Sequence, residues 1–511
     1  MSLSMQSGLR RRGHILTVAS HVLAAATLAL PLVAALRHPA GWFTTLLVTV
    51  VFGATALSPP IGLLALIISL PLTPALERFS AVPLLPAGLT EMLLLAFCSA
   101  SWLRSDHASG ASRSRLSGPA LVLAAAVVTS AICEFSALAA TLPQQPQSLE
   151  LWRHVTADYW QTMGPFGMVH HALRWLAGLT VAVATERILR VRPLWWATTF
   201  RAWLLAGCLA GILTGLAVVK LLLRSPPTAM LFDVLESLRV SVLTVDVNAA
   251  GSYFALLLVA ALVVGVRRRQ WLTLAVAVPL LSLGFIAAQS RAAMAAVTAV
   301  VSGTIMLNLG RTGRAWRMVV SGLAAVLLLA GALYATSQSH VALTDATAVR
   351  LQMTRVGLQM TRHFPVFGVG VGDYVRMSRR WITPDMEVLR GFAPRGENAH
   401  NNFLQVMAEL GIPALLVFIY MTGSVALLGW RRRSGPVVPE VEGLSLGIAA
   451  FLLSALFGHP LLVSQVGALF WLAMGIAASG APPLPLRRST SRYAVAAAVL
   501  FYVVSLLWRL S

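Results

Sequence analysis

Two side chains in this sequence stand at the edges of apolar runs, where polar groups are costly. Arg291 lies between two apolar runs, directly after Ser290, and His400 lies just before the apolar run that starts at Phe403. An imidazole can accept a proton near neutral pH. A guanidinium at such a boundary needs a cavity or an anionic partner, unless it reaches the phospholipid head groups. His400 is therefore a candidate general base, with a helix-entry role as the alternative, and Arg291 is a candidate anion-binding group.

The segment 336–401 is the only long polar stretch of the chain, and it is rich in arginine. Guanidinium groups form strong charge-assisted hydrogen bonds with phosphate and carboxylate groups, so their concentration here favours an anionic partner. A solvated helix face or contact with lipid head groups is the alternative for any single one of them. The arginines of this segment are Arg350, Arg355, Arg362, Arg376, Arg379, Arg380, Arg390 and Arg395.

Within this segment, the pattern from Thr344 to His363 predicts a helix that is capped by Thr344 or Asp345 and ended by Pro365. Three polar side chains share one face of such a helix, at positions i, i+4 and i+7. They are Arg355, Gln359 and Arg362.

A flexible turn follows, with glycine at Gly368, Gly370 and Gly372. It resembles a phosphate-binding loop only superficially, because no strand precedes it and no Lys-Ser/Thr pair follows it. A nucleotide site is therefore not predicted.

Further polar groups accompany these candidates. Arg174 lies beside His170 and His171 near the end of an apolar run, and Arg239 lies in a polar connector. Glu409, inside the helix predicted after His400, is a candidate buried partner for one of the cations, and a role in helix packing is the alternative. The residues next to His400 are Asn401 and Asn402, which have the side chains of helix caps.

Lipid must solvate most of this chain. Its 511 residues are 57% hydrophobic and 11% charged, with a mean hydropathy of +0.77, and a water-soluble globule cannot bury so much apolar surface. The net charge of +21 comes from short arginine clusters between apolar runs, which argues against nucleic-acid binding. Cys98, Cys133 and Cys208 lack metal-type or redox-type spacing, so no disulfide framework or zinc site is predicted.

The apolar runs predict an all-α polytopic membrane protein with about 12–15 transmembrane helices and one large helical loop outside the membrane. The domain organisation follows: transmembrane helices over 1–335, the large loop over 336–401, and C-terminal transmembrane helices over 402–511. The predicted spans are 14–36, 41–57, 60–76, 84–103, 118–141, 168–185, 194–223, 247–266, 270–288, 291–309, 316–335, 402–429, 443–459, 461–479 and 492–509.

The arginine clusters set the orientation of these spans. When the chain starts with Arg10, Arg11 and Arg12 inside, strict alternation puts every other short basic connector inside as well, as the positive-inside rule requires. The same alternation puts the longer connectors 142–167, 224–246 and 336–401 outside. His400 and Arg291 are thus expected at the outer face.

Four stretches in this order resemble the O-antigen ligase and polymerase superfamily, whose members share a membrane core and a large periplasmic loop. They are Val247-Asn248 followed by Tyr253-Phe254; Ser290-Arg291-Ala292; the helix from Arg350 that ends in Phe364-Pro365-Val366-Phe367-Gly368-Val369-Gly370; and His400-Asn401-Asn402-Phe403-Leu404-Gln405 through Glu409-Leu410-Gly411-Ile412. The resemblance covers roughly residues 240 to 430. It departs at Ala292, where the family commonly has glycine.

The resemblance implies glycan transfer from an undecaprenyl diphosphate carrier, at the periplasmic side of a bacterial inner membrane, without metal, nucleotide or other cofactor. It implies His400 as general base, removing a proton from the acceptor hydroxyl, and arginines that stabilise the charge on the leaving diphosphate. The expected substrate-binding residues are Arg291, Arg239, Arg350, Arg355, Asn401, Arg395 and Arg174.

The acceptor stays open at this point. The leading hypothesis is an O-antigen ligase of lipopolysaccharide biosynthesis, which transfers the glycan to a sugar of lipid A-core. A polysaccharide polymerase and a protein O-oligosaccharyltransferase of the same superfamily need the same parts. A lipid-linked glycan flippase or other transporter would place ionisable residues near mid-membrane in both halves, whereas the cations here gather at the outer boundary.

Overall fold

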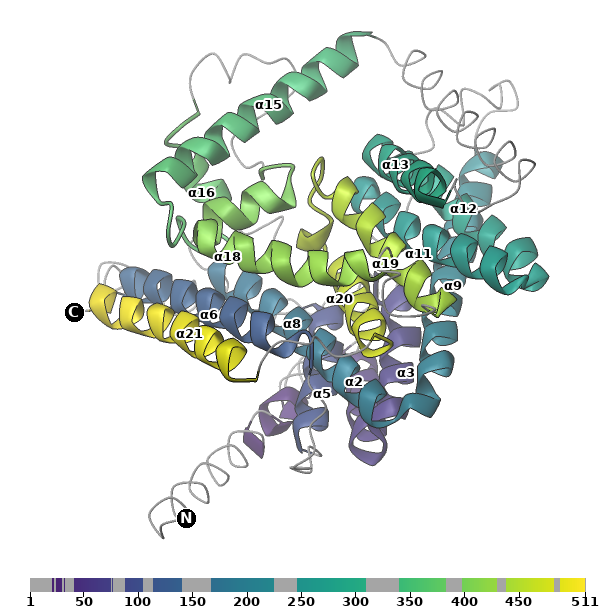
Figure 1. The fold of residues 1–511 in the computed structure, drawn as a ribbon, viewed down its shortest axis with the longest axis horizontal. Coiled ribbons are helices and arrows are strands. Elements are labelled where there is room, and N and C mark those ends of the chain that lie inside the picture. The colour runs from purple at the N-terminus through teal and green to yellow at the C-terminus, as the bar shows by residue number, and fades with distance from the viewer. Residues whose placement is uncertain are drawn as a thin grey trace.

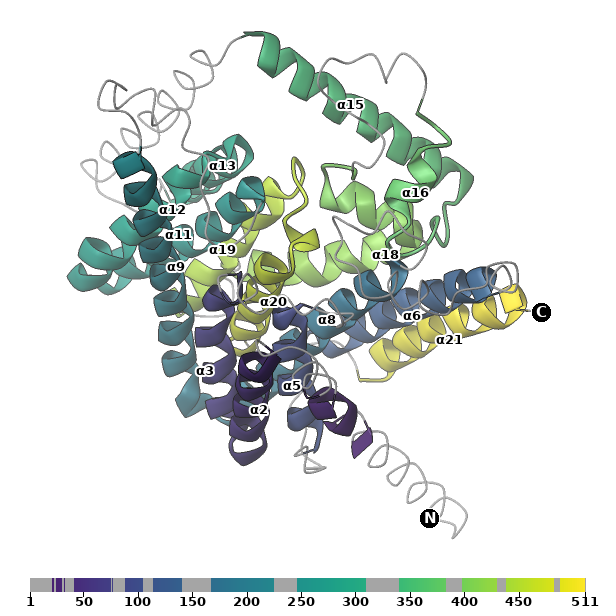
Figure 2. The same ribbon diagram turned by 180° about the vertical axis from the view of Figure 1, so that it is seen from behind.

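All regular structure in the described residues is helical. The computed structural model describes residues 21–22, 24–29, 32, 41–74, 76, 88–103, 114–139, 167–224, 246–308, 340–382, 398–429, 438–481 and 488–510, and no strand occurs within these ranges. Figures 1 and 2 show the helices from opposite sides. The predicted all-α fold is confirmed.

The helices are, in chain order, α2 (Gly41–Leu57), α3 (Pro59–Ser69), η1 (Leu70–Leu72), α5 (Leu89–Leu103), α6 (Ser117–Ala139), α8 (Gly167–Val191), η3 (Pro193–Trp195), α9 (Trp196–Arg224), α11 (Val247–Arg268), the π-helical turn η4 (Thr273–Ala277), α12 (Val278–Ala288), α13 (Arg291–Asn308), α15 (His340–His363), α16 (Tyr374–Ser378), α18 (Asn402–Ala426), η5 (Leu427–Gly429), α19 (Pro439–Ser454), η7 (Pro460–Leu462), α20 (Ser464–Ser479) and α21 (Arg488–Leu510).

Several helices have the length and composition of membrane spans. Those long and apolar enough to cross a bilayer are Ser117–Ala137, Pro193–Arg224, Val247–Arg268 and Asn402–Gly429. Shorter apolar helices match other predicted spans, and they are Trp42–Leu57, Pro59–Leu72, Leu89–Leu103, Thr273–Ala288, Arg291–Ile305, Ser464–Ser479 and Tyr493–Leu507. The predicted span 316–335 and most of the span 14–36 lie outside the described residues.

Helices α11 and α19 form the centre of the core and pack against each other along their length. Close approach depends on glycine, because a Cβ on Gly447 would come within 2.3 Å of the Leu256 carbonyl oxygen, and one on Gly443 within 2.8 Å of that of Ala260. The end of α11 meets the start of α19 through ion pairs, Arg267 to Glu442 at 2.9 Å and Arg268 to Glu440 at 3.0 Å. The two helices are therefore antiparallel.

The arginine clusters and the candidate site lie at opposite ends of the same helices. Helix α11 begins after Asp246 and ends at its arginine cluster, and α8 begins with His170, His171 and Arg174 and ends near Arg190. At the basic end of α8, the buried carboxylate of Glu186 accepts hydrogen bonds from Arg190 Nε and from the backbone N–H groups at the start of α6. This arrangement agrees with the alternation predicted from the arginines.

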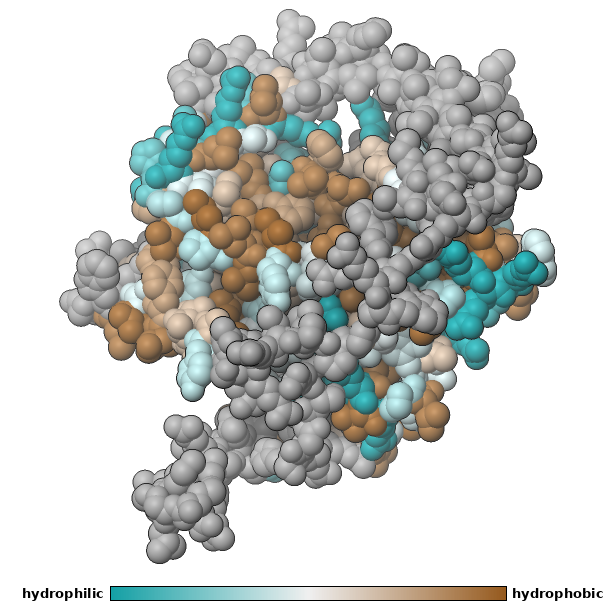
Figure 3. Space-filling model, viewed as in Figure 1, coloured by the Kyte–Doolittle hydropathy of each residue, from teal (hydrophilic) through white to brown (hydrophobic). Residues whose placement is uncertain are grey.

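Helix α15 packs one face on the beginning of α18 and leaves the other exposed. Val356, Met360 and Tyr374 of α15 and α16 form a small cluster with Leu404 and Ala408 of α18. Figure 3 shows hydrophilic residues gathered toward the upper left, where α15 lies, beside a mostly hydrophobic middle. The predicted helix to His363 is confirmed, but it starts at His340, so the predicted caps Thr344 and Asp345 lie inside it.

The glycine turn docks into a kink of α18. Pro413 has no N–H, and Gly411 adopts a non-helical backbone with φ of 86°. Carbonyl groups in the preceding turn of α18 therefore lose their helical donors. The N–H of Val369 donates to Ala408 O at 2.8 Å, and that of Gly370 donates to Glu409 O at 3.1 Å. The turn thus takes over the hydrogen bonds that the kink releases.

The same turn is also fixed to α6. The N–H of Val371 donates to Ser130 Oγ at 2.8 Å, and Arg376 pairs with Glu134 at 3.1 Å and with Asp373. The side-chain hydrogen bond from Arg376 to Asp373 raises the pKa of this arginine, which keeps the guanidinium charged. Because its N–H groups at 369, 370 and 371 have protein acceptors, the turn holds the segment that carries α15 and α16 on the helices α6 and α18.

Candidate functional site

His400 lies at the mouth of α18, half-buried, in a backbone conformation that few residues adopt. Its φ is 48°, and its N–H donates to Asn398 Oδ1 at 2.9 Å. The next residue, Asn401, caps α18, because its Oδ1 accepts from the N–H groups of Phe403 and Leu404 at 2.9 and 3.1 Å. The predicted position of His400 at a helix mouth is thus confirmed. The substrate contact predicted for Asn401 stays a prediction.

Asn402 fastens the connector between α19 and α20 to the start of α18. Its backbone N–H donates to Ala455 O at 2.9 Å and to Gly458 O at 3.1 Å, and its buried Oδ1 accepts from the N–H of Leu461 at 3.1 Å. These bonds hold the residues before η7 against the mouth of α18. They bring His459 next to His400.

His459 and Asp246 complete the surroundings of His400. The imidazole rings of His400 and His459 meet edge to face, with centroids 5.3 Å apart. His459 Nε2 lies 2.9 Å from Asp246 Oδ2, and His459 is 7% exposed. An aspartate from the start of α11, a histidine from the connector after α19 and a histidine from the start of α18 therefore form a continuous series.

Asp246 also caps α11. Its Oδ1 accepts from the N–H groups of Asn248 and Ala249 at 2.9 and 3.2 Å, while Oδ2 faces His459. Burial raises the pKa of this carboxyl, but the hydrogen bond and charge of His459 and the two backbone N–H groups outweigh burial and lower it. Asp246 is therefore ionised across the neutral range.

The sequence reasoning missed both His459 and Asp246. His459 stands in Gly458-His459-Pro460, between two apolar runs at the predicted outer boundary, in the same kind of position as His400. Asp246 precedes Val247 and Asn248 at the start of a predicted span, which is where a capping aspartate is expected. Each signal was local, and the contact between them depends on the packing of α11 against α19.

Arg174 is the predicted cation that the structure places in a buried polar network. Its guanidinium donates to the Leu462 carbonyl and, through Nη2, to His170 Nε2 at 2.7 Å, and its Nε lies 3.6 Å from Glu91 Oε1. A guanidinium has no acceptor, so His170 Nε2 accepts in this contact. Ser464 also donates to Glu91. Arg174 thereby joins α8 and α5 to the connector that carries His459.

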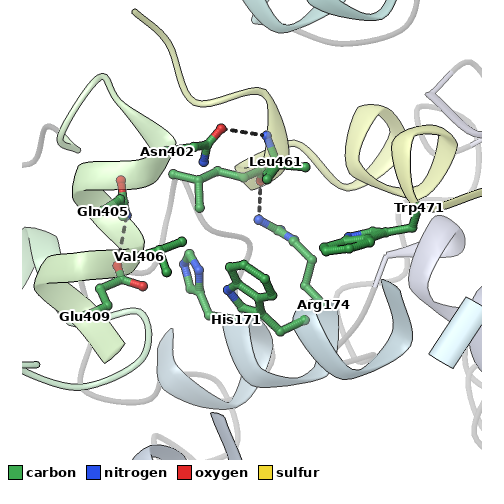
Figure 4. Close-up of a pocket in the computed structure, with 10 residues that line it drawn as sticks. His171, Arg174, Asn402, Gln405, Val406, Glu409, Leu461 and Trp471 are labelled. Carbon is green, nitrogen blue, oxygen red and sulfur yellow. Dashed lines mark hydrogen bonds between the residues drawn. The ribbon is translucent and has the colours of Figure 1, made fainter. Parts of the chain in front are cut away.

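A pocket opens on the other side of that connector. Figure 4 shows Arg174 and His171 of α8 facing Gln405 and Glu409 of α18, with Trp471 closing one side. The lining residues are His171, Arg174, Trp175, Asn402, Gln405, Val406, Glu409, Leu461, Leu462 and Trp471. Asn402 thus lines the pocket and also binds the His459 connector through its backbone N–H and its Oδ1.

Glu409 is held by neutral donors. Gln405 Nε2 donates to its Oε1 at 2.8 Å, and the backbone N–H groups of Gly372 and Tyr374 also bond to the carboxyl. These donors come from the helix of Glu409 itself and from the glycine-turn segment. Of the two roles considered for Glu409, the helix-and-loop packing role describes these contacts.

Arg291 begins α13 with an exposed side chain. Gln289, with φ of 46°, ends α12, and the buried Ser290 Oγ accepts from the N–H of Ala293 at 3.4 Å. A Cβ on Gly251 would lie 2.4 Å from Ser290 Cβ, so glycine there lets the start of α13 sit against the start of α11. Arg291 is therefore at the same end of the molecule as Asp246.

The remaining predicted cations are dispersed. Arg350 and Arg355 are exposed on α15, as are Gln359 and Arg362, away from the face that packs on α18. Arg239 and Arg395 lie outside the described residues. Within the described part of the chain, no group of three or more His, Cys, Asp or Glu side chains has an arrangement that could hold a metal ion.

Comparison with known proteins gives one family. Residues 276–419 match the family model described as O-antigen ligase. No curated protein matches the chain. The matched range runs from α12 through the kink of α18 and contains Arg291, the exposed face of α15, the glycine turn and His400. This part of the chain is therefore similar to the O-antigen ligase family, as the four sequence stretches predicted.

Proposed function

We propose that this protein transfers a glycan from undecaprenyl diphosphate to a sugar hydroxyl of lipid A-core, at the periplasmic face of a bacterial inner membrane. The observation that carries the proposal is the position of His400 within the matched domain. It stands at the mouth of a membrane-type helix, half-buried, against His459 and with the exposed Arg291 at the same end of the fold.

The reaction needs a base and a stabilised leaving group. The acceptor hydroxyl oxygen attacks the anomeric carbon, the bond from that carbon to the diphosphate oxygen breaks, and its electron pair leaves with the diphosphate. His400 takes the proton of the hydroxyl, which is worth roughly 10²- to 10⁴-fold in rate. A single displacement of this kind inverts the anomeric carbon.

Guanidinium groups meet the second need. Negative charge grows on the leaving phosphate, and preorganised guanidinium groups stabilise it through charge-assisted hydrogen bonds. Arg291 is the described cation best placed for this role, because it is exposed at the end of the fold that carries Asp246 and His459. Arg239, Arg350, Arg355, Arg395 and Arg174 are the further cations proposed to bind donor or acceptor.

The location explains how a lipid substrate reaches the residues. A polyprenyl chain stays in the hydrocarbon of the bilayer while its diphosphate projects at the surface. The arginine clusters at Arg267–Arg268 and near Arg190 lie at the far ends of α11 and α8 from His400, which supports a cytoplasmic position for them and an outer position for His400.

The decisive experiment offers purified protein a carrier-linked glycan together with separate acceptors: lipid A-core, a second carrier-linked glycan, and a hydroxyl-bearing protein. The reactions run with chelator present. We expect extension of lipid A-core. Extension of the second carrier-linked glycan would identify a polymerase and replace our assignment, and extension of the protein would identify a protein transferase.

The base is tested in the same assay. His400→Ala should abolish transfer while the protein stays inserted and abundant. His363→Ala is the matched control, because His363 is an exposed histidine at the end of α15 whose Nδ1 contacts Gln359 O, and it should retain transfer. Full activity of His400→Ala would remove the base assignment.

A further inference from the structure

We infer that His459 and Asp246 are a positioning pair for His400, holding its imidazole and favouring the protonated form that it reaches when it takes the acceptor proton. The inference rests on the proposed function, and it assigns the second histidine and the aspartate a part in the same reaction. Neither residue lies within the matched range of residues 276–419.

Contact geometry carries the first half of the inference. His400 has an unusual backbone conformation, and its N–H is bound to Asn398, so its position depends on local supports. The His459 ring packs edge to face against it, 5.3 Å between centroids, with an interplanar angle of 64°. His459 itself is fixed by Asp246 at 2.9 Å and by the Asn402 bonds to its connector.

Charge carries the second half. Asp246 is an ionised carboxylate with a side chain that is 10% exposed, and His459 is the group between it and His400. A carboxylate behind an imidazole stabilises the imidazolium that forms during proton transfer and orients the ring. Here that carboxylate acts through a second imidazole.

Other ionisable groups at this end of the fold must be considered with the pair. Arg291 begins α13, beside the start of α11. Glu91, His170 and Arg174 form a network on the Leu462 side of the connector, and this network includes the Leu462 carbonyl and Ser464. His171 lines the pocket on the same side. The carboxylate that contacts His459 is that of Asp246, with His459 Nε2 2.9 Å from Asp246 Oδ2.

Asp246 offers a variant that separates charge from structure. Its two oxygens have different tasks, since Oδ1 caps α11 and Oδ2 faces His459. Asparagine is as good a helix cap as aspartate and can still accept one hydrogen bond. Asp246→Asn therefore keeps the cap and removes the charge.

The experiment measures transfer against pH for the wild type, Asp246→Asn and His459→Gln. Loss of the carboxylate disfavours protonated histidine, so the acid limb of the profile should move to lower pH by about one unit in Asp246→Asn. The maximal rate should fall about tenfold, with little change in KM for the donor, because the imidazolium loses its stabilisation. Glutamine in His459→Gln can still donate to Asp246, but it lacks the imidazole ring that packs on His400. The maximal rate of this variant should fall by the same factor.

Glu442→Gln is the control, because Glu442 is a buried carboxylate paired with Arg267 at the other end of α11. It should leave both the limb and the rate unchanged. If Asp246→Asn lost activity by the same factor at every pH, and the acid limb of its pH profile did not move, the pair would have only a structural role. A wild-type rate in either Asp246→Asn or His459→Gln would also overturn the inference.

A second readout does not need transfer. Hydrogen–deuterium exchange at histidine C2, followed by mass spectrometry, reports the protonation of His400 and His459 separately in the purified protein. We expect their exchange midpoints to move to lower pH in Asp246→Asn and to stay in Glu442→Gln. A protein that performs no glycan transfer but shows this shift would defeat the proposed function and keep the pair, whereas unchanged midpoints would defeat the pair alone.

Discussion

At the mouth of α18, neighbouring side chains divide two tasks between them. Asn401 caps α18, and Asn402 binds the connector that carries His459. The backbone N–H of His400 donates to Asn398, and its ring packs against His459. A run of consecutive polar residues thus places one imidazole. Substitution of Asn401 or Asn402 should lower the stability of the fold, whereas substitution of His400 should lower the rate of transfer.

The proposed function assigns Arg291 to the leaving diphosphate. Because its side chain is exposed, Arg291→Lys should leave thermal stability in detergent unchanged. It should reduce transfer by at least about tenfold, since an ammonium cannot reproduce the two parallel hydrogen bonds of a guanidinium to phosphate. Steady-state transfer rates with a carrier-linked donor measure this. Wild-type turnover in the lysine variant would make Arg291 a head-group contact.

Asp246 gives a prediction for stability against pH. Its pKa is lowered in the folded protein, so its charge stabilises the fold fully above the pKa it has when unfolded, about 4, and this contribution is lost as pH falls through the lower folded value. At pH 5, above the unfolded pKa of the carboxyl, the melting temperature of wild type should exceed that of Asp246→Asn. The gap should close below about pH 4, and a gap that widened there would contradict the sign.

What could be predicted at this scale was each residue type at its boundary. His400, Arg291 and Arg174 were identifiable because charged or titratable groups beside apolar runs are rare. The partners were not identifiable, since Glu91, Asp246 and His459 are distant in sequence from the groups they contact. Which carboxylate meets which cation depends on helix packing that hydropathy does not encode.

Among the elements, the kinked α18 and the glycine turn form one unit. Pro413 and Gly411 break the helix, and the turn supplies the missing donors from 369 and 370. The sequence predicted a flexible turn there. The structure shows a turn whose N–H groups are bonded to α18 and α6, and its glycines are required by positive φ and close backbone approach.

Substitution of Gly368 should test this unit. Its φ is +67°, and a Cβ would lie 2.2 Å from the backbone carbon of Glu409, so Gly368→Ala should destabilise the protein by about 2 kcal/mol or more. Gly423→Ala on the same α18 is the matched control, because nothing lies within 4 Å of its Cβ. It should be neutral or stabilising by up to about 1 kcal/mol. Chemical denaturation in mixed micelles compares the two, and equal stabilities would refute the docking argument.

For the molecule as a whole, orientation is the claim that the proposed function depends on. Cysteine at position 355, on the exposed face of α15, should react with a membrane-impermeant thiol reagent added to intact cells whose outer membrane is permeabilised. Position 271 lies beside the arginine cluster, and the native Trp271 is 76% exposed. A cysteine there should react only after the inner membrane is opened. Cys98, Cys133 and Cys208 are replaced beforehand. The reverse pattern would place His400 in the cytoplasm.

The global architecture was the most predictable part, because lipid imposes long apolar helices and basic connectors on one side. The all-α fold and the helix ending at His363 followed from that and from local stop signals. The start of α15 did not, since the helix begins at His340, four residues before the predicted cap Thr344. The sequence also contained no sign that Gly443 and Gly447 allow α19 to approach α11 closely.

Contacts hold α11 and α19 together at both ends: arginine–glutamate pairs at one, and at the other Asp246 with His459, which lies in the connector after α19. Two rods joined in this way cannot slide past each other when the surrounding acyl chains shorten or lengthen, so a thinner or thicker bilayer must adapt by tilting the pair or deforming its own leaflets. The contact between Asp246 and His459 should therefore not depend on the lipid composition of the membrane.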